Sequence, residues 1–152
     1  MPIGQTPIDE FIKRGKLLSE DVAWFNAFDT YTKKQIIQLI QTRWTDEGTD
    51  EDGKIIGLYS LSTEFITKGR KKEGDPYDLN MFGDFRRSMY VLVFLNEIFI
   101  GADGQKGDEN LFTKWNAKEK IIGLTDEDFE KVKETVKEKY FEYIDRTLFG
   151  AI

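Results

Sequence analysis

The apolar positions at the start of the chain recur at helical spacing. Ile8, Phe11 and Ile12 predict one or two helical turns in residues 8–16, within an arm that is otherwise expected to be extended. Ser19 precedes two acidic residues, and this order is typical of the N-cap and first turn of a helix. The pattern therefore predicts an N-terminal arm followed by a short helix.

A longer amphipathic helix is expected next. Thr30 or Thr32 can cap it, and the helical period continues to about Trp44. Its apolar stripe consists of Ile36, Ile37, Ile40 and Trp44, and its water-facing side consists of Lys33, Lys34, Gln38 and Gln41. Residues 45–53 contain two glycines and no apolar side chain, which is typical of a solvated loop.

Two segments without clear periodicity follow. Residues 58–66 fit either a strand or a short helix, and both alternatives stay open. Residues 68–78 form a second polar loop with the main basic run of the chain, which consists of Lys68, Arg70, Lys71 and Lys72. A solvated loop is the simplest interpretation of this run, and contact with DNA or an acidic partner is the alternative.

Two β-branched and aromatic runs in the second half predict a tight hairpin. They are Met89–Leu95 and Ile98–Ile100, and Asn96 and Glu97 separate them. The first run is apolar on both faces, whereas a half-exposed strand alternates apolar with polar residues. We therefore expect helices to cover one face and a neighbouring layer or another subunit to cover the other.

The C-terminal part predicts a long capped helix. Residues 102–110 form a third polar loop, after which Leu111, Phe112 and Trp115 predict a short apolar turn. Thr125 then opens a helix in a TxxD variant of the capping box. Apolar residues recur at helical spacing through Leu148, at Phe129, Val132, Val136, Tyr140, Tyr143 and Ile144.

Together these elements predict an α+β fold. A small antiparallel sheet is expected to be packed by the long C-terminal helix Thr125–Leu148, with an N-terminal helical extension. The length of 152 residues fits a single domain, with the extension in residues 1–45 and the α+β core in residues 54–152.

Composition excludes several kinds of catalysis. The chain has no Cys and no His, which removes thiolate nucleophiles, Ser-His-Asp relays and Cys/His zinc sites. The net charge of −6 opposes non-specific adhesion to nucleic acid. The absence of disulfides fits a reducing cytosol, and the longest apolar run falls well short of the ~20 residues of a membrane span. We therefore expect a soluble protein without a membrane partner.

The acidic loop is the best candidate for a metal site. Its carboxylates belong to Asp46, Glu47, Asp50, Glu51 and Asp52. Against the EF-hand pattern, however, Gly48 occupies the first ligand position and Tyr59 the twelfth, where a bidentate Glu is required. The glycine-rich segment 101–107 likewise lacks the GK[ST] of a phosphate-binding loop. We expect no catalytic residue, metal or cofactor, and a metal-dependent hydrolase is the less favoured alternative.

Two motifs in the second half carry a family resemblance. GDFRRSMYVLV begins at Gly83, EIFIGAD follows, and the segment from Asn110 to Val136 contains IIGLTDEDFEKV. This order resembles the phage virion-morphogenesis and tail-completion family, whose members show TGxLRxSI, a hairpin ending near a Gly, and FLGLSDEDLEEI. The matching residues are Gly83, Phe85, Arg86, Ser88 and Met89 in the first motif and Ile122, Gly123, Leu124, Thr125, Asp126, Glu127, Asp128 and Phe129 in the second.

The resemblance covers about residues 75 to 145. GDPYDLN followed by GDFRRS is also similar to structural proteins of phages that infect gut Bacteroidota. Two features depart from the family: its HQFG-like stretch appears here only as NLFTKW, and the helical N-terminus is longer than expected.

The resemblance implies a structural protein of the virion and not an enzyme. Copies of the chain would form a ring in the phage neck, between the portal or adaptor and the tail, after assembly in the host cytoplasm. DNA would pass through the channel without sequence readout. The expected interface residues are Ile8, Phe11, Ile12, Tyr90, Leu92, Phe94, Leu148, Phe149 and Ile152. A small monomeric adaptor or regulatory protein that binds a protein partner is the alternative.

Overall fold

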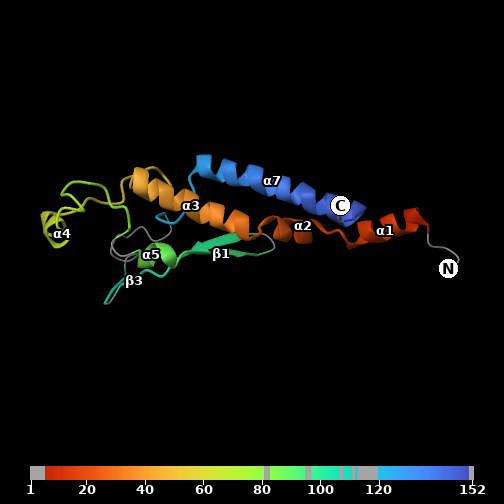
Figure 1. The fold of residues 1–152 in the computed structure, drawn as a ribbon, viewed down its shortest axis with the longest axis horizontal. Helices are drawn as coiled ribbons and strands as arrows, with labels where there is room; N and C mark the ends of the chain where they lie inside the picture. Colours follow the sequence, from red (N-terminus) through yellow and green to blue (C-terminus); the bar gives the residue numbers. More distant parts are fainter. Residues whose placement is uncertain are drawn as a thin grey trace.

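The structure is a computed structural model that describes residues 6–80, 83–94, 97–106, 108–110, 112 and 120–150. The helices are α1 (Pro7–Leu17), α2 (Glu20–Ala27), α3 (Thr30–Asp46), α4 (Leu61–Ile66), α5 (Asp84–Arg87) and α7 (Asp126–Phe149). The strands are β1 (Tyr90–Val93), β2 (Ile98–Gly101), β3 (Gln105–Lys106) and β4 (Glu109–Asn110). The molecule is elongated, with α4 at one end and α1 at the other (Figure 1).

The N-terminal arm is more helical than the sequence predicts. In place of one or two turns, α1 extends over 11 residues. Thr6 and Asp9 form a reciprocal capping box, with Thr6 Oγ1 accepting from Asp9 N at 3.2 Å and Asp9 Oδ2 accepting from Thr6 N at 2.8 Å. Pro7 occupies the first helical position, where its missing N–H costs nothing. These starting signals lie on both sides of Ile8, the first of the apolar residues.

The two following helices begin at well-formed caps. Ser19 caps α2 as predicted, accepting from Val22 N at 3.2 Å. The cap of α3 is Asp29, and not Thr30 or Thr32, because the Asp29 carboxylate accepts from Thr32 N at 2.9 Å. The buried hydroxyl of Thr32 instead donates to Ala27 O at 3.2 Å and ties α3 to the end of α2. A carboxylate in the cap position satisfies free N–H groups and suits the positive end of the helix dipole.

The predicted antiparallel hairpin is confirmed. Leu92 pairs with Phe99 and Val93 with Ile98. Phe94 N donates to Glu97 O at 2.8 Å, and residues 95 and 96 between them are outside the described residues. Asn96 of the predicted turn therefore cannot be compared with the structure.

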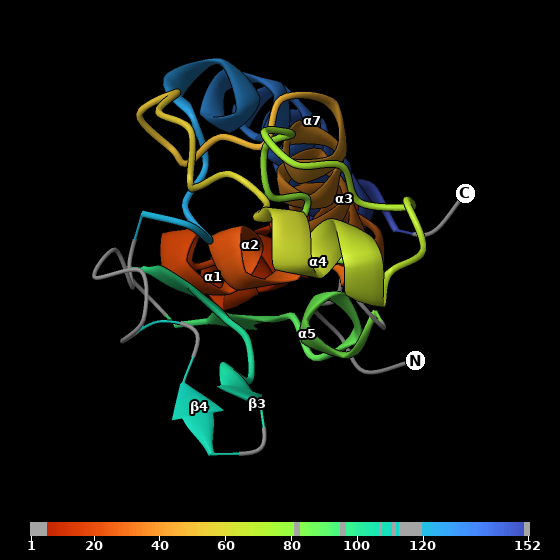
Figure 2. The ribbon, with the colours of Figure 1, turned by 90° about the vertical axis from the view of Figure 1, so that its left-hand side faces the viewer.

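The predicted α+β class with a long C-terminal helix is also confirmed, and the helices form two layers over the sheet. Figure 2 shows the hairpin below, α1, α2 and α3 in the middle, and α7 above them. The helix in direct contact with β1 is α3, whereas α7 packs mainly on α2, with further contacts to α3 and α1. No helix in the described part of the chain has both the length and the apolar character of a membrane span.

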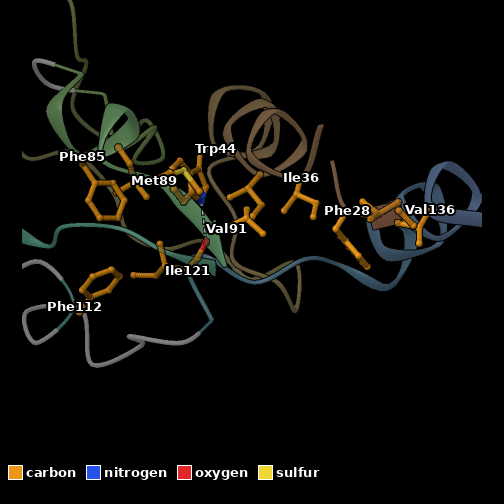
Figure 3. Close-up of a cluster of buried hydrophobic side chains, with 13 residues drawn as sticks. Phe28, Ile36, Trp44, Phe85, Met89, Val91, Phe112, Ile121 and Val136 are labelled. Atoms are coloured by element: carbon orange, nitrogen blue, oxygen red, sulfur yellow. Dashed lines mark hydrogen bonds between the residues drawn. The ribbon is translucent and has the colours of Figure 1, made fainter. Parts of the chain in front are cut away.

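The core lies between α3, the hairpin and the start of α7 (Figure 3). Ile36, Ile40 and Trp44 are fully buried, as the predicted stripe requires. The Trp44 ring packs against Phe85 at 5.5 Å between centroids, and its Nε1 donates to Ile121 O at 3.0 Å. Other core residues are Ala27, Phe28, Leu79, Met89, Val91, Phe112, Val132 and Val136. Ile37 is only half-buried, and Gln41, expected to face water, donates to Arg86 O at 2.9 Å.

Residues 45–53, predicted as a solvated loop, are exposed at both ends but buried at their centre, and α3 extends through the first two of them. Gly48, Thr49 and Asp50 are buried, and Arg43 Nε donates to Thr49 O at 3.1 Å. Gly48 has φ +63°, and a Cβ there would collide with Pro76. The sequence of residues 45–53 does not indicate these contacts, because a segment with polar side chains can still have a buried backbone.

The remaining segments differ in how far the sequence predicts them. Residues 58–66, left open between strand and helix, contain α4, capped by Ser60. Thr125 caps α7 as predicted, accepting from Asp128 N at 3.1 Å. Phe129, expected on the apolar face of this helix, is 52% exposed. Of the predicted turn after residue 110, only Phe112 lies within the described residues, and it is buried.

Candidate functional site

The predicted interface residues at the two chain ends lie together. α1 packs along the last turns of α7, and the rings of Phe11 and Phe149 are 5.7 Å apart. Ile8 and Ile12 are exposed beside them, and Leu148 is half-buried. We call these residues the terminal patch. Ile152, also predicted, lies outside the described residues.

The outer face of the hairpin exposes a second apolar set. Val91 is buried toward α3, whereas Tyr90, Leu92 and Phe94 point to the opposite side with 44–49% of their surface exposed. Phe99, which the sequence analysis missed, pairs with Leu92 and is 51% exposed, with its ring 6.2 Å from that of Tyr90. We call Tyr90, Leu92, Phe94 and Phe99 the hairpin face. Phe99 can be assigned to this face only when the strand register is known.

A third apolar set lies on α4, at the end of the molecule opposite to α1 (Figure 1). Phe65 and Ile66 are the most exposed large apolar side chains of the described residues, at 76% and 77%. The basic run follows directly, and Lys68, Arg70 and Lys72 are exposed. We call residues 61–72 the tip. The sequence indicates the basic run, but not the exposed Phe65 and Ile66, because a six-residue helix is too short to show a period.

A groove between α2, α7 and the start of β2 is the fourth feature, and sequence reasoning also missed it. It has a volume of about 730 Å³. Apolar side chains line it, namely Trp24, Phe28, Ile98, Phe129, Val132, Val136, Tyr140 and Phe141. Its charged rim consists of Glu20, Asp21 and Glu97 toward α2 and the hairpin, and Lys133 and Lys137 toward α7.

The carboxylates of the acidic loop are engaged in local contacts. Asp50 Oδ1 accepts from Asp52 N at 3.0 Å and from Lys54 N at 2.9 Å. Asp52 forms an ion pair with Lys120, and Glu47 accepts from the Thr49 hydroxyl at 3.1 Å. Within the described residues, no three groups of the kinds that bind metal are placed to share an ion.

The base of the tip is held by a small polar cluster. Asp78 Oδ1 accepts from the Tyr59 hydroxyl at 2.7 Å, and the Lys71 ammonium pairs with the same carboxylate. Burial favours the neutral form of Asp78, but Lys71 and Tyr59 outweigh burial and lower the pKa of this carboxyl group below its usual value. Burial, together with Asp78, raises the pKa of Tyr59. One member of the basic run therefore has a structural role.

Acid is expected to weaken this cluster. Because folding lowers the pKa of Asp78, the group stabilises the fold above its unfolded pKa, near 3.9, and loses that effect as the pH falls through the folded pKa. Asp78→Asn should lower Tm most at neutral pH, and the difference from wild type should shrink below about pH 4. Thermal unfolding followed by circular dichroism between pH 7 and 3 measures this, with the exposed Asp75→Asn as the control. A constant difference across the range would contradict it.

The residues that carry the family resemblance have structural roles. The Ser88 hydroxyl donates to Phe85 O at 2.7 Å and accepts from Asp103 N at 2.9 Å, which joins α5 to the segment after β2. Arg86 places its guanidinium 5.9 Å from the Trp44 ring centre. Gly123 lies against Glu51, so closely that a Cβ would collide with that side chain.

No known protein family, curated protein or solved structure matches this chain.

Proposed function

We propose that this chain is a structural protein of the phage neck or tail, copies of which form a ring that joins the portal or adaptor to the tail. The observation that carries the proposal is the hairpin face, which one copy leaves half exposed. The order of the two sequence motifs supports the same assignment.

The hairpin face has the composition of a surface that becomes buried on assembly. Monomeric proteins rarely expose a large contiguous apolar patch, and complete burial of one large apolar side chain is worth about 1.5–3 kcal/mol. Tyr90, Leu92 and Phe99 lie side by side on two paired strands, so one flat partner surface can cover them at once. In the proposed ring, a neighbouring copy buries the hairpin face.

The terminal patch suits a ring better than a symmetric dimer. It lies at one end of the elongated molecule, on different elements from the hairpin face (Figure 1). In a cyclic ring each copy uses two different surfaces, one toward each neighbour. Two separate apolar patches on different elements meet that requirement.

The charge of the chain fits a channel through which DNA slides. The net charge is −6, and like-charge repulsion keeps phosphate backbones from adhering to such a surface. The proposed mechanism is docking and sealing, without chemical turnover, and portal or adaptor and tail proteins are the proposed neighbours.

Self-association of the full chain tests the proposal. Light scattering from roughly 10 µM to 1 mM should show a mass above that of one copy, and electron microscopy should show closed rings. Leu92→Glu places a charge on the hairpin face and should return the mass to that of one copy. Ile55→Glu is the matched control, because Ile55 is 57% exposed but lies outside the hairpin face and the terminal patch. Equal assembly of wild type and Leu92→Glu would reject the hairpin face as the interface.

Purified particles of the phage that encodes the chain provide an independent readout. Mass spectrometry of these particles should detect the chain in several copies per particle. A chain that is absent from particles and has the mass of one copy at every concentration would instead be a monomeric adaptor.

A further inference from the structure

We propose that the groove between α2, α7 and β2 receives the tip of a second copy, so that Phe65 and Ile66 of one copy dock on the apolar floor of the next. This inference rests on the proposed function, because it names a contact through which copies associate. It adds a pair of surfaces distinct from the hairpin face and the terminal patch.

The groove has the character of a binding site for apolar side chains. Phe28, Val132 and Val136 are buried and form its floor, while Phe129 and Phe141 are more than half exposed at its border. Its volume of about 730 Å³ falls within the roughly 300–1,000 Å³ of pockets that enclose drug-sized molecules. It therefore has room for a phenylalanine and an isoleucine together.

The tip has the matching character of a ligand. Phe65 and Ile66 are adjacent on the last turn of α4 and are more than three-quarters exposed. The Asp78 cluster and the pairing of Leu58 with Pro76 hold the base of the tip in place, so little order has to be gained on docking. Apolar anchors entering a desolvated pocket are the usual source of affinity in protein interfaces.

The groove of the same chain is out of reach of its own tip. α4 lies at one end of the molecule, whereas α2 and α7, which form the groove, lie along its middle (Figure 1). The contact is therefore between copies, and because a tip meets a groove it is heterologous. Contacts of this type close into a ring or continue as a filament.

Charge identifies a second copy as the occupant. Lys68, Arg70 and Lys72 follow the apolar anchors directly, and the rim of the groove toward α2 carries Glu20 and Asp21. Glu73 follows the tip in the sequence and is acidic, while the α7 side of the rim is basic through Lys133 and Lys137. Complementary charges of this kind orient partners and reject wrong ones.

Engineered cysteines test the contact directly, because the chain has none of its own. Ile66→Cys on the tip and Phe129→Cys at the groove are made as separate full-length variants and mixed under mild oxidation. A disulfide-linked dimer with one chain of each kind should exceed either homodimer several-fold. In the control, Ile66→Cys is mixed with Ile55→Cys, which places an equally exposed thiol away from the groove. Equal yields in the two mixtures would overturn the inference.

Charge-reversal variants provide a second test of the contact between the tip and the groove. Lys68→Glu/Lys72→Glu on the tip, or Glu20→Lys/Asp21→Lys on the rim, should each reduce the heterodimer yield several-fold. A chain that carries all four changes should recover it, because the signs are again opposite. Circular dichroism confirms that each variant is folded. Loss without recovery would overturn the charge assignment.

The outcomes separate this inference from the proposed function. Failure of the cross-link, with assembly that still depends on Leu92, overturns the tip and groove but leaves the ring protein in place. A specific cross-link from a chain that is absent from phage particles keeps the contact and overturns the neck assignment. A groove that captures an apolar peptide or detergent but not the tip also overturns the inference.

Discussion

Replacing Trp44 with alanine is expected to lower the free energy of unfolding by about 3–5 kcal/mol, the usual cost of removing a fully buried aromatic ring. The Trp44 side chain is completely buried, packs on Phe85, and donates to Ile121 O at 3.0 Å. Its loss opens a cavity where α3, α5 and the segment before α7 meet. Urea unfolding followed by circular dichroism measures the change.

A second variant separates the ring from its hydrogen bond. Trp44→Phe keeps most of the apolar contact but removes the indole donor to Ile121 O, which still accepts from Arg43, so about 0.5–1.5 kcal/mol should be lost. Tyr31→Ala serves as the control, because Tyr31 is also aromatic on α3 but is 63% exposed. A loss below about 1 kcal/mol in Trp44→Ala would mean that Trp44 is not the centre of the core.

Arg43→Met is expected to have a comparable effect through a different mechanism. Arg43 is buried, donates to Thr49 O at 3.1 Å and to Ile121 O at 3.2 Å, and lies 3.9 Å from the carboxylate of Asp128. Methionine fills most of the space, but it leaves the buried carboxylate of Asp128 without the nearby positive charge of Arg43. Removing one partner of a buried ion pair costs about 3–5 kcal/mol. Lys131, at 3.3 Å from Asp128, should keep the loss near the lower limit.

The combination of the two changes gives a sharper result. Arg43 and Trp44 both donate to the carbonyl of Ile121, so the losses in Arg43→Met and Trp44→Phe should not be additive. Arg43→Met/Asp128→Asn should recover part of the stability, because the unpaired charge is then removed. Additive losses and no recovery would contradict a shared network.

The sequence predicts the regular elements because each of them carries its own local signal. The apolar residues of α3 recur at the period of a helix, and the hairpin consists of β-branched and aromatic runs typical of strands. Ser19 and Thr125 are the N-caps of α2 and α7. Asp29 was missed as a cap because Thr30 and Thr32, within the next three positions, are nearly as suitable. The packing of α3 on the sheet was missed because periodicity shows which face is apolar but not what covers it.

The candidate site was predictable only in part, for the same reason. Leu92 and Phe11 are apolar residues in predicted elements, so the sequence indicates them directly. Phe99 joins the hairpin face only through its pairing with Leu92. The groove combines residues of α2, β2 and α7 that are more than 100 positions apart in sequence, such as Glu20 and Val132. No local pattern contains that information.

The bond between Trp44 and Ile121 has a consequence for synthesis, because it joins residues 77 positions apart. At the usual rate of about 5–20 residues per second, a ribosome needs roughly 4–15 s to make the chain between them. During this interval α3 has emerged with Ile36, Ile40 and Trp44 in water, although its contacts to α7 do not yet exist. The nascent helices are thus a natural substrate for a chaperone that shields apolar surface, and production at low temperature or with such a helper should raise the yield of folded protein.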